Sequence, residues 1–462
     1  MPKKENTPPG QSKQQQPKQF EGLPEEYRIY TVAVIATAVV YFFSNPKPQN
    51  YYDYTFRVAA NILTGSIGFT ENPPSWLNEF VPFEGFYYSV FPFGSVVSMM
   101  PFAALKAIGW INDMPAAFIS ALCAGVICLF LFLISKRYDI DRSRRIVMML
   151  GVLFGTWMWT NLTMAGAWQL ALGFAMIGEL GAIYFTVYHR RPLIAGLFFA
   201  LAFGNRTEVL LTAPIFFWFL SRNKFVPVAS ASEQHRSVPP ASAGGKAPRK
   251  ESTLQDVDSR PPAHAGGTDL WITRPQVIAI ALFCLVPFLL GVSTLVYNYI
   301  RFHSFADFGY ARIPGVLNEP WYNHGIFSYH YIPRQMWEML WRAWETRATF
   351  PYLVPNPFSS SILWSSPFLL FAFRRGARDH GLKIVSWIAV IVLCILLWMH
   401  GNSGGWQFGY RYAMVCLPWL FVIMLENSPK KLTPLEWVAY AFSFAANIYA
   451  TWLFHWTKYL NP

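Results

Sequence analysis

One acidic residue stands out among those that could do chemistry, Asp53 in the run Tyr51-Tyr52-Asp53-Tyr54. Aromatic neighbours would partly remove its carboxylate from water, which raises the pKa and suits the group to accept a proton as a general base. The alternative is that Asp53 caps a helix expected over 54–64, since Asp is a favoured N-cap residue. From the residues alone, both interpretations stay open.

A second polar group interrupts the apolar stretch between 191 and 222, which is too long for one ordinary membrane crossing. It contains Arg206 and Glu208 in the run Asn205-Arg206-Thr207-Glu208. We expect two short helices that meet at this polar tip. An ionisable pair at membrane depth commonly marks a functional site, and Arg can bind a phosphate through two hydrogen bonds. A mutual ion pair that closes a tight hairpin is the alternative.

A glycine-rich segment runs from His400 to Arg411 and contains Trp406 between them. Such segments let backbone N–H groups approach a phosphate or a sugar, and Arg411 would add positive charge. The alternative is a tight connection that ends in an Arg extending toward the membrane surface.

Aromatic residues with interleaved Arg, Asn and His fill the segment 301–357, including Tyr310 in Phe308-Gly309-Tyr310. Aromatic faces of this kind often stack on sugars, although an aromatic belt at the membrane surface has the same composition. Glu179 lies inside an apolar run and could relay a proton in a transporter or form a buried hydrogen bond. The strings Asp139-Ile140-Asp141 and Asp256-Val257-Asp258 fall in segments predicted to be cytoplasmic, so we expect no metal site.

The composition indicates that these residues are positioned by membrane helices. Of 462 residues, 53% are hydrophobic and 18% aromatic but only 13% charged, which argues against a water-soluble enzyme. The net charge of +12 comes without a basic helix or zinc-ligand spacing, so we expect no nucleic-acid partner. All five cysteines lie in apolar runs and are predicted to be buried free thiols.

We therefore predict an all-α polytopic membrane protein with about 11 crossings (10–13), given a hydrocarbon core of ~30 Å. Two large outer loops, 45–93 and 301–357, should carry juxtamembrane helices, and 94–109 should be a juxtamembrane or re-entrant helix. The expected crossings are 28–44, 114–135, 146–160, 165–188, 276–300, 358–373, 383–399, 410–427 and 435–456, together with the stretch 191–222.

The basic residues predict the orientation, because Lys and Arg concentrate in cytoplasmic segments. Most of the 37 Lys and Arg fall in segments that this rule places in the cytoplasm, with the N-terminus inside and the C-terminus outside. The predicted organisation is a disordered tail (1–27), an N-terminal membrane module (28–226) with the catalytic loop 45–93, a disordered insertion (227–269) and a C-terminal module (270–462). Loop 45–93 also carries further charged residues, namely Arg57, Glu71, Glu79 and Glu84.

In their order along the chain, several of these pieces resemble the GT-C superfamily of polytopic glycosyltransferases, specifically the bacterial branch similar to dolichyl-phosphate-mannose protein mannosyltransferases. The resemblance covers most of the chain outside 1–27 and 227–269. It is carried by Asp53 with Ala60-Asn61-Ile62-Leu63-Thr64-Gly65, Tyr88-Ser89-Val90-Phe91-Pro92-Phe93-Gly94, Ala202-Phe203-Gly204-Asn205-Arg206-Thr207-Glu208, Tyr297-Asn298, Phe308-Gly309-Tyr310, Ser366-Pro367 and Gly404-Gly405-Trp406-Gln407-Phe408-Gly409-Tyr410-Arg411-Tyr412.

The resemblance implies transfer of a sugar from a polyprenyl-phosphate carrier to an acceptor at the extracytoplasmic face, with Asp53 as the catalytic carboxylate. The acceptor could be protein, glycolipid or polysaccharide, and the protein would lie in the inner membrane of a bacterium among its lipids. Many members have a paired acidic motif where Asp53 has tyrosine neighbours, so we expect no metal and no cofactor besides the lipid-linked sugar.

The mechanism expected from this resemblance is an inverting transfer. A phosphate leaving group needs charge stabilisation more than a proton, so one base and one or two arginines could suffice. Asp53 would be the base, and the donor phosphate would be bound by Arg206 and Arg411, with Arg57 in reserve. The expected substrate-binding residues are Glu208, Tyr310, His400 and Trp406. A transporter or flippase of a polyprenyl-linked or lipid substrate is the alternative, with Glu179, Arg206 and Glu208 along its path.

Overall fold

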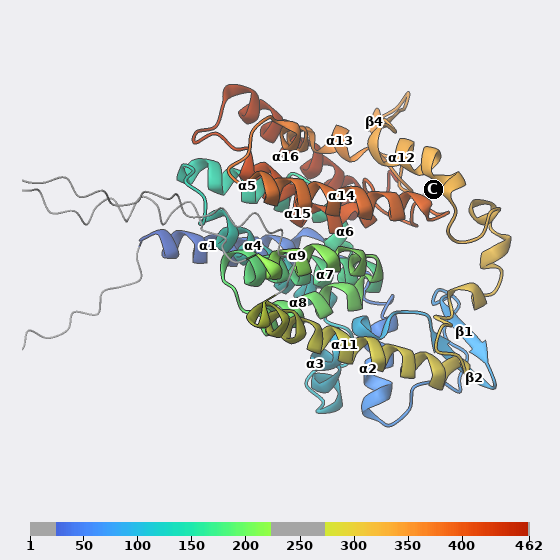
Figure 1. Cartoon of the computed structure of the whole chain (residues 1–462). Coiled ribbons are helices and arrows are strands. Elements are labelled where there is room, and N and C mark those ends of the chain that lie inside the picture. The colour runs from blue at the N-terminus through green and yellow to red at the C-terminus, as the bar shows by residue number, and fades with distance from the viewer. Residues whose placement is uncertain (1–24, 223–272, 461–462) are drawn as a thin grey trace, which may run out of the picture.

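The computed structural model of the chain describes residues 25–222 and 273–460, and these residues are mostly helical (Figure 1). Before the gap lie α1 (Glu25–Ser44), α2 (Tyr54–Leu63), β1 (Phe80–Phe83), β2 (Phe86–Ser89), α3 (Phe93–Ala107), α4 (Ala116–Ser135), α5 (Arg142–Phe154), α6 (Met158–Met164), α7 (Ala167–Ile183), α8 (Pro192–Asn205) and α9 (Ala213–Ser221). After it lie α11 (Arg274–Phe302), α12 (Ile332–Leu340), β3 (Glu345–Thr346), β4 (Leu353–Val354), α13 (Ile362–Ser365), α14 (His380–Met399), α15 (Leu417–Glu426) and α16 (Pro434–Trp456). The predicted tail 1–27, apart from the start of α1, and the predicted insertion 227–269 lie outside the described residues.

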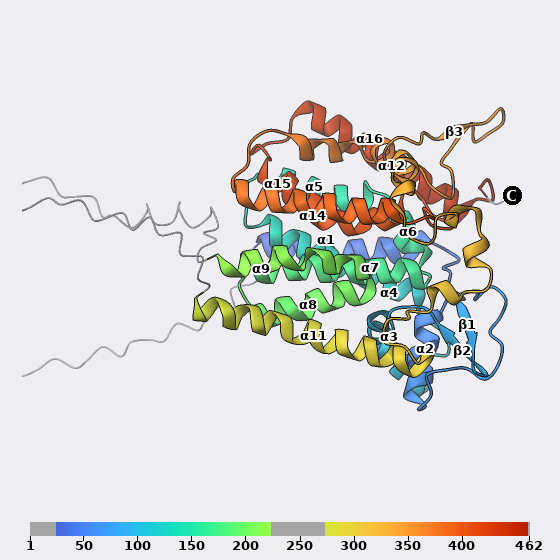
Figure 2. The same cartoon turned by 45° about the vertical axis from the view of Figure 1, so that its right-hand side comes forward.

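The helices form a bundle whose two ends differ (Figures 1 and 2). The start of α1, the end of α9 and the start of α11 lie at one end. Helix α2, the strands β1 and β2 and the end of α16 lie at the other, which we call the loop end. The two large loops thus lie at one end of the bundle.

Five helices in the described part of the chain are long and apolar enough to cross a membrane. They are Tyr27–Ser44, Ala116–Ser135, Ala167–Tyr188, Arg274–Phe302 and His380–Met399. A sixth span results if α5 and α6, which meet at a bend of 47°, are counted as one. The chain is therefore a helical protein with several potential membrane spans, but the predicted number of about 11 crossings is not confirmed.

Proline residues interrupt two of the predicted crossings, because proline lacks an N–H donor and disrupts the preceding helical turn. The predicted crossing 358–373 consists of the short α13 and a 3-10 helix that begins at Pro367. The predicted crossing 410–427 is a 3-10 helix followed by the 10-residue α15, whose second residue is Pro418. The stretch 191–222 is broken after Arg206 into α8 and a 3-10 helix that leads into α9, so the prediction of two short helical segments is confirmed.

Burial differs strongly between the long helices. Nearly all of α7 is buried, whereas α1 and α11 leave most of their apolar residues exposed. Exposed apolar helix faces of this length are suited to contact lipid, because lipid tails are as apolar as leucine side chains. Four of the cysteines are buried as predicted, and Cys284 on α11 is partly exposed.

The strands were not predicted from the sequence. Strands β1 and β2 pair antiparallel, with Phe80 opposite Ser89 and Phe83 opposite Phe86, and so make a hairpin within loop 45–93. The strands β3 and β4 form a second short pair inside loop 301–357. Glu79 directly precedes the first hairpin.

A close contact between two glycines joins the first loop to the polar tip at Arg206. A Cβ on Gly94, near the start of α3, would lie 2.4 Å from Cα of Gly204 near the end of α8. Only glycine allows two backbones to approach in this way. The contact is supported by a hydrogen bond of 2.8 Å from Asn205 Nδ2 to Ser98 Oγ. Helix α3 thus fixes the position of the tip beside the first loop.

The opposite end of the bundle is held by a buried charge cluster. Arg144 on α5 lies 2.6 Å from Glu436 on α16, and both side chains are only 1% exposed. Arg374 approaches the same carboxylate at 2.5 Å. Buried ions require such partners, so the cluster joins the two helices far from the loop end.

Candidate functional site

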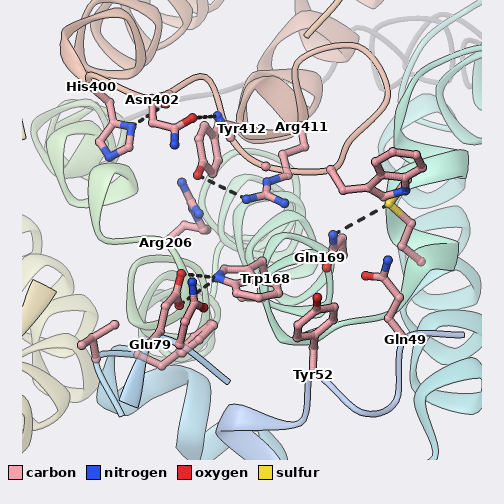
Figure 3. Close-up of a pocket in the computed structure, with 18 of the residues that line it drawn as sticks. Gln49, Tyr52, Glu79, Trp168, Gln169, Arg206, His400, Asn402, Arg411 and Tyr412 are labelled. Carbon is pink, nitrogen blue, oxygen red and sulfur yellow. Dashed lines mark hydrogen bonds between the residues drawn. The ribbon is translucent and has the colours of Figure 1, made fainter. Parts of the chain in front are cut away.

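A cavity of about 1040 Å³ lies at the loop end and is lined by segments from both halves of the chain. The first loop, the start of α7, the tip at Arg206, the second loop, the glycine-rich segment and the C-terminal end of α16 all contribute (Figure 3). The cavity brings together most of the predicted site residues, namely Arg206, Glu208, Tyr310, His400, Trp406 and Arg411.

Asp53 and Arg57 are not among the residues that line the cavity. The carboxylate of Asp53 accepts hydrogen bonds of 3.1–3.2 Å from Arg57, one helical turn later on α2, and makes no capping bond to the backbone. Burial raises the pKa of Asp53, while the charge of Arg57 opposes this. Asp53 and Arg57 are thus each other's partners. Asp53 occupies the N-cap position of α2, but its side chain does not make the hydrogen bond that the capping alternative predicts.

Three carboxylates line the cavity, namely Glu79, Glu208 and Glu319, and the sequence analysis did not single out Glu79. Both of its oxygens accept from the indole Nε1 of Trp168, at 3.1 and 2.9 Å (Figure 3). Burial raises the pKa of Glu79 to about 7, against the lowering effects of the Trp168 hydrogen bond and the charge of Arg411. Nearby Glu319 raises it further. At neutral pH this carboxylate can therefore both accept and release a proton.

Trp168, near the start of α7, is held in place by three rings. Its centroid lies 5.0 Å from that of Tyr52, 5.2 Å from Tyr54 and 6.0 Å from Phe91. Aromatic rings at such separations attract each other and leave little room for rotation. The packing therefore fixes the direction in which the indole N–H holds Glu79.

Arg411 is a buried cation that lines the cavity. The residue is only 6% exposed, and its Nε has no hydrogen-bond partner among the described residues. No carboxylate of the described residues forms an ion pair with it, and Nη2 reaches only the hydroxyl of Tyr412, at 3.4 Å. Its guanidinium lies 5.8 Å from the ring centroid of Trp168. A buried charge with so few partners is costly, so the site is suited to an anion.

Arg206 and Arg411 both lie close to the Tyr412 ring (Figure 3). The guanidinium of Arg206 is 4.7 Å from that ring centroid, and the guanidinium of Arg411 is 5.2 Å from it. Unlike Arg411, Arg206 is paired with Glu208 at 2.6 Å, as the ion-pair alternative predicted. The pair nevertheless lines the cavity, so Arg206 adds to the positive potential around Arg411.

His400 completes this side of the cavity. Its Nδ1 lies 2.6 Å from the backbone oxygen of Asn402, so Nδ1 carries the proton and donates it. Burial and the charges of Arg206 and Arg411 lower the pKa of His400, which keeps the ring neutral. Nε2 is then an acceptor for a ligand hydroxyl.

Around His400 the second loop places a group of aromatic side chains. The rings of Tyr310 and Tyr322 lie 6.3 and 5.8 Å from that of His400, and their hydroxyls are 3.0 Å apart. Only Tyr310 of these two tyrosines lines the cavity. Tyr310, from the aromatic segment 301–357, thus forms part of the cavity wall.

The glycine-rich segment is braced by Gln407. Its Oε1 accepts from the backbone N–H of Arg411 at 2.8 Å, and its Nε2 donates to the backbone oxygen of Ser403 at 2.8 Å. Trp406 turns toward α16, where its ring lies 5.4 Å from that of Phe454. The segment therefore positions Arg411 through its backbone.

Glu179 does not line the cavity. It is fully buried on α7, and its Oε1 accepts from Nε1 of Trp419 at 3.0 Å. The interpretation as a hydrogen-bonded residue that faces a neighbouring helix is confirmed. No group of three or more His, Cys, Asp or Glu side chains within 25–222 and 273–460 is arranged to hold a metal ion.

No protein-family model matches the sequence, and neither a curated protein nor a solved structure matches it.

Proposed function

We propose that the chain is a membrane glycosyltransferase that moves a sugar from a polyprenyl-phosphate carrier to an acceptor hydroxyl. The observation that carries the proposal is the pairing of two opposite groups at one cavity. Glu79, whose pKa burial raises to about 7, accepts from the indole N–H of Trp168 (Figure 3). Arg411, a buried guanidinium without an ion-pair partner among the described residues, lies 5.8 Å from the centroid of the same indole. A base and an anion site are what this transfer needs.

In the proposed reaction, the acceptor oxygen attacks C1 of the sugar while its proton passes to the carboxylate of Glu79. The bond from C1 to the phosphate oxygen breaks, and the polyprenyl phosphate leaves with the electron pair. Arg411, assisted by Arg206, stabilises the charge that develops on the phosphate. A single displacement of this kind inverts the configuration at C1. Glu79 thus takes the role that the sequence analysis gave to Asp53, which pairs with Arg57 and is not among the residues that line the cavity.

The cavity would face the extracytoplasmic side of the membrane. The basic loop 136–145 and Lys430 lie where α5 and α16 begin, opposite the loop end. Because basic loops stay in the cytoplasm, the loop end would be outside. The broken segments around Arg206 and Arg411 would then lie at or below the outer membrane surface, where an isoprenoid carrier presents its phosphate. We place the protein in the inner membrane of a bacterium.

The test is a transfer assay with the purified full-length protein in lipid nanodiscs. Labelled polyprenyl-phosphate hexoses and pentoses serve as donors, and the released sugar and free carrier are measured. We expect Glu79→Gln to lower turnover by at least about 100-fold while the donor still binds. Full turnover in this variant would show that Glu79 is not the base. Movement of intact donor across vesicles without cleavage would favour the flippase instead.

A further inference from the structure

The cavity extends past Trp168 to a side that the proposed reaction has not used. Gln49, Tyr52 and Gln169 line this part, on the far side of Arg411 from His400 (Figure 3). The connection between α1 and α2 meets the end of α6 here, since the backbone N–H of Gln49 donates to the Met164 carbonyl at 2.8 Å. The C-terminal segment 455–458 closes the wall.

Gln169 is a buried amide whose oxygen has no hydrogen-bond partner among the described residues. The residue is 1% exposed, its Oε1 is unpaired, and its Nε2 reaches only the sulfur of Met164, at 3.8 Å. Leaving a buried acceptor unpaired costs about 1–3 kcal/mol unless a ligand or water satisfies it. Because Gln169 lines the cavity, the open oxygen is available to a bound group.

The amide of Gln49 converges on the same place. A Cβ added to Gly166 would lie 2.9 Å from Oε1 of Gln169 and 3.4 Å from Oε1 of Gln49. Tyr52 lies against the same point, since its Cβ would also be 3.4 Å away. Two carboxamides beside an aromatic ring form a surface that hydrogen-bonds vicinal hydroxyls and packs on an apolar sugar face.

Two positively charged residues are among those that line the cavity. Lys47 and Lys458 both line it, both are exposed, and neither forms an ion pair with another described residue. They come from opposite ends of the described chain, so the charge is gathered by the fold. Ammonium groups so placed attract an anion.

We propose, on the basis of the glycosyl transfer inferred above, that Gln49, Tyr52, Gln169, Lys47 and Lys458 form the acceptor subsite, and that the acceptor is a saccharide bearing an anionic group. The amides and Tyr52 bind the sugar ring, and the two lysines bind its phosphate or carboxylate. One hydroxyl of the ring then faces Glu79 across the same cavity. Arg411 remains free for the phosphate of the donor.

The experiment measures binding of small probes to the full-length protein in nanodiscs by ligand-observed NMR. The probes are glucose 6-phosphate and glucuronate, with glucose and inorganic phosphate as the neutral and sugar-free references. We expect at least one anionic sugar to bind about tenfold more tightly than either reference, and the stronger of the two identifies the anion. Gln169→Leu, and separately the double variant Lys47→Ser with Lys458→Ser, should weaken that binding about tenfold or more.

Two controls separate this inference from the proposed function. Lys430→Ser removes an exposed charge at the opposite end and should leave probe binding unchanged. Arg411→Gln should also leave it unchanged. Loss of binding in Arg411→Gln but not in the lysine variant would show that the probes occupy the donor site, which overturns the acceptor subsite and leaves glycosyl transfer intact.

Equal binding of glucose and the anionic sugars would also overturn the saccharide acceptor subsite. Displacement of glucose 6-phosphate by an acidic serine-containing peptide, but not by a neutral peptide, would overturn it as well. Absence of donor cleavage in the transfer assay would instead contradict the proposed function itself.

Discussion

The indole N–H of Trp168 donates to both carboxylate oxygens of Glu79, at 2.9 and 3.1 Å. One donor shared between two oxygens holds the carboxylate in one plane and leaves the outer lone pairs open to the cavity. The two residues are 89 positions apart in the sequence, on the first loop and on α7. A rigid helix thus aims a group carried by a loop.

The pH dependence of transfer should report Glu79 directly. A base must be ionised to accept a proton, and burial raises the pKa of Glu79 to about 7. We therefore expect kcat/KM to rise with pH through about 7 and to level off above it. The acid limb of kcat should lie at higher pH, because the bound phosphate neutralises Arg411, whose charge lowers the pKa of Glu79. A kcat/KM that is flat between pH 5 and 9 would contradict the role of Glu79.

Trp168→Phe should move that acid limb further toward alkaline pH. The indole N–H stabilises the ionised form of Glu79, and phenylalanine removes the donor while keeping an aromatic ring. A hydrogen bond to a charged group contributes about 1.5–3 kcal/mol, so a displacement of about one to two pH units is expected. The measurement is the pH profile of kcat/KM for both proteins. An acid limb at lower pH would mean that water replaces the indole as a better donor.

Arg411→Gln should weaken donor binding more than Arg206→Gln does. Arg411 is buried without an ion-pair partner among the described residues, whereas Glu208 already neutralises Arg206 at 2.6 Å. A charge-assisted hydrogen bond to phosphate contributes about 1.5–3 kcal/mol, so the donor KM of Arg411→Gln should rise about 10- to 100-fold. The double variant Arg206→Gln with Glu208→Gln is the matched control, because it removes a pair without leaving an unpaired carboxylate. Equal effects of Arg411→Gln and this control would contradict the special role of Arg411.

A site residue could be predicted where its own stretch of sequence makes it stand out, but not where its surroundings come from distant parts of the chain. Arg206 and Arg411 stand out because each interrupts an apolar run, and both line the cavity. The helix expected over 54–64 is α2. Glu79 could not be identified in this way, since its burial arises from Trp168 on a distant helix. The predicted number of crossings is not confirmed for a related reason. Mean hydropathy does not show that the apolar runs at Pro367 and Pro418 are divided into short helices.

Asp53→Asn distinguishes the base inferred from the structure from the one that the resemblance implies. Asp53 pairs with Arg57 one turn away, with 17% and 38% of the side chains exposed. Such pairs contribute about 0.2–1 kcal/mol, so Asp53→Asn should lower stability slightly and keep turnover within about tenfold of the wild type. The measurement is turnover in the transfer assay beside Glu79→Gln. Loss of turnover in Asp53→Asn with full activity in Glu79→Gln would return the catalytic role to Asp53.

Gly409→Ala should destabilise the glycine-rich segment and displace Arg411. Gly409 has a φ of +66°, and a Cβ there would lie 2.8 Å from the Cβ of buried Trp157. Both the positive φ of Gly409 and the close approach to Trp157 disfavour a side chain at this position. We therefore expect a loss of about 1–3 kcal/mol in stability and a higher donor KM. Gly405→Ala is the matched control for stability, since nothing lies within 4 Å of its added Cβ. The thermal midpoint in nanodiscs and the donor KM are the measurements. Equal midpoints for the two variants would mean that the segment shifts freely, and that Arg411 is not fixed by the packing of Gly409 against Trp157.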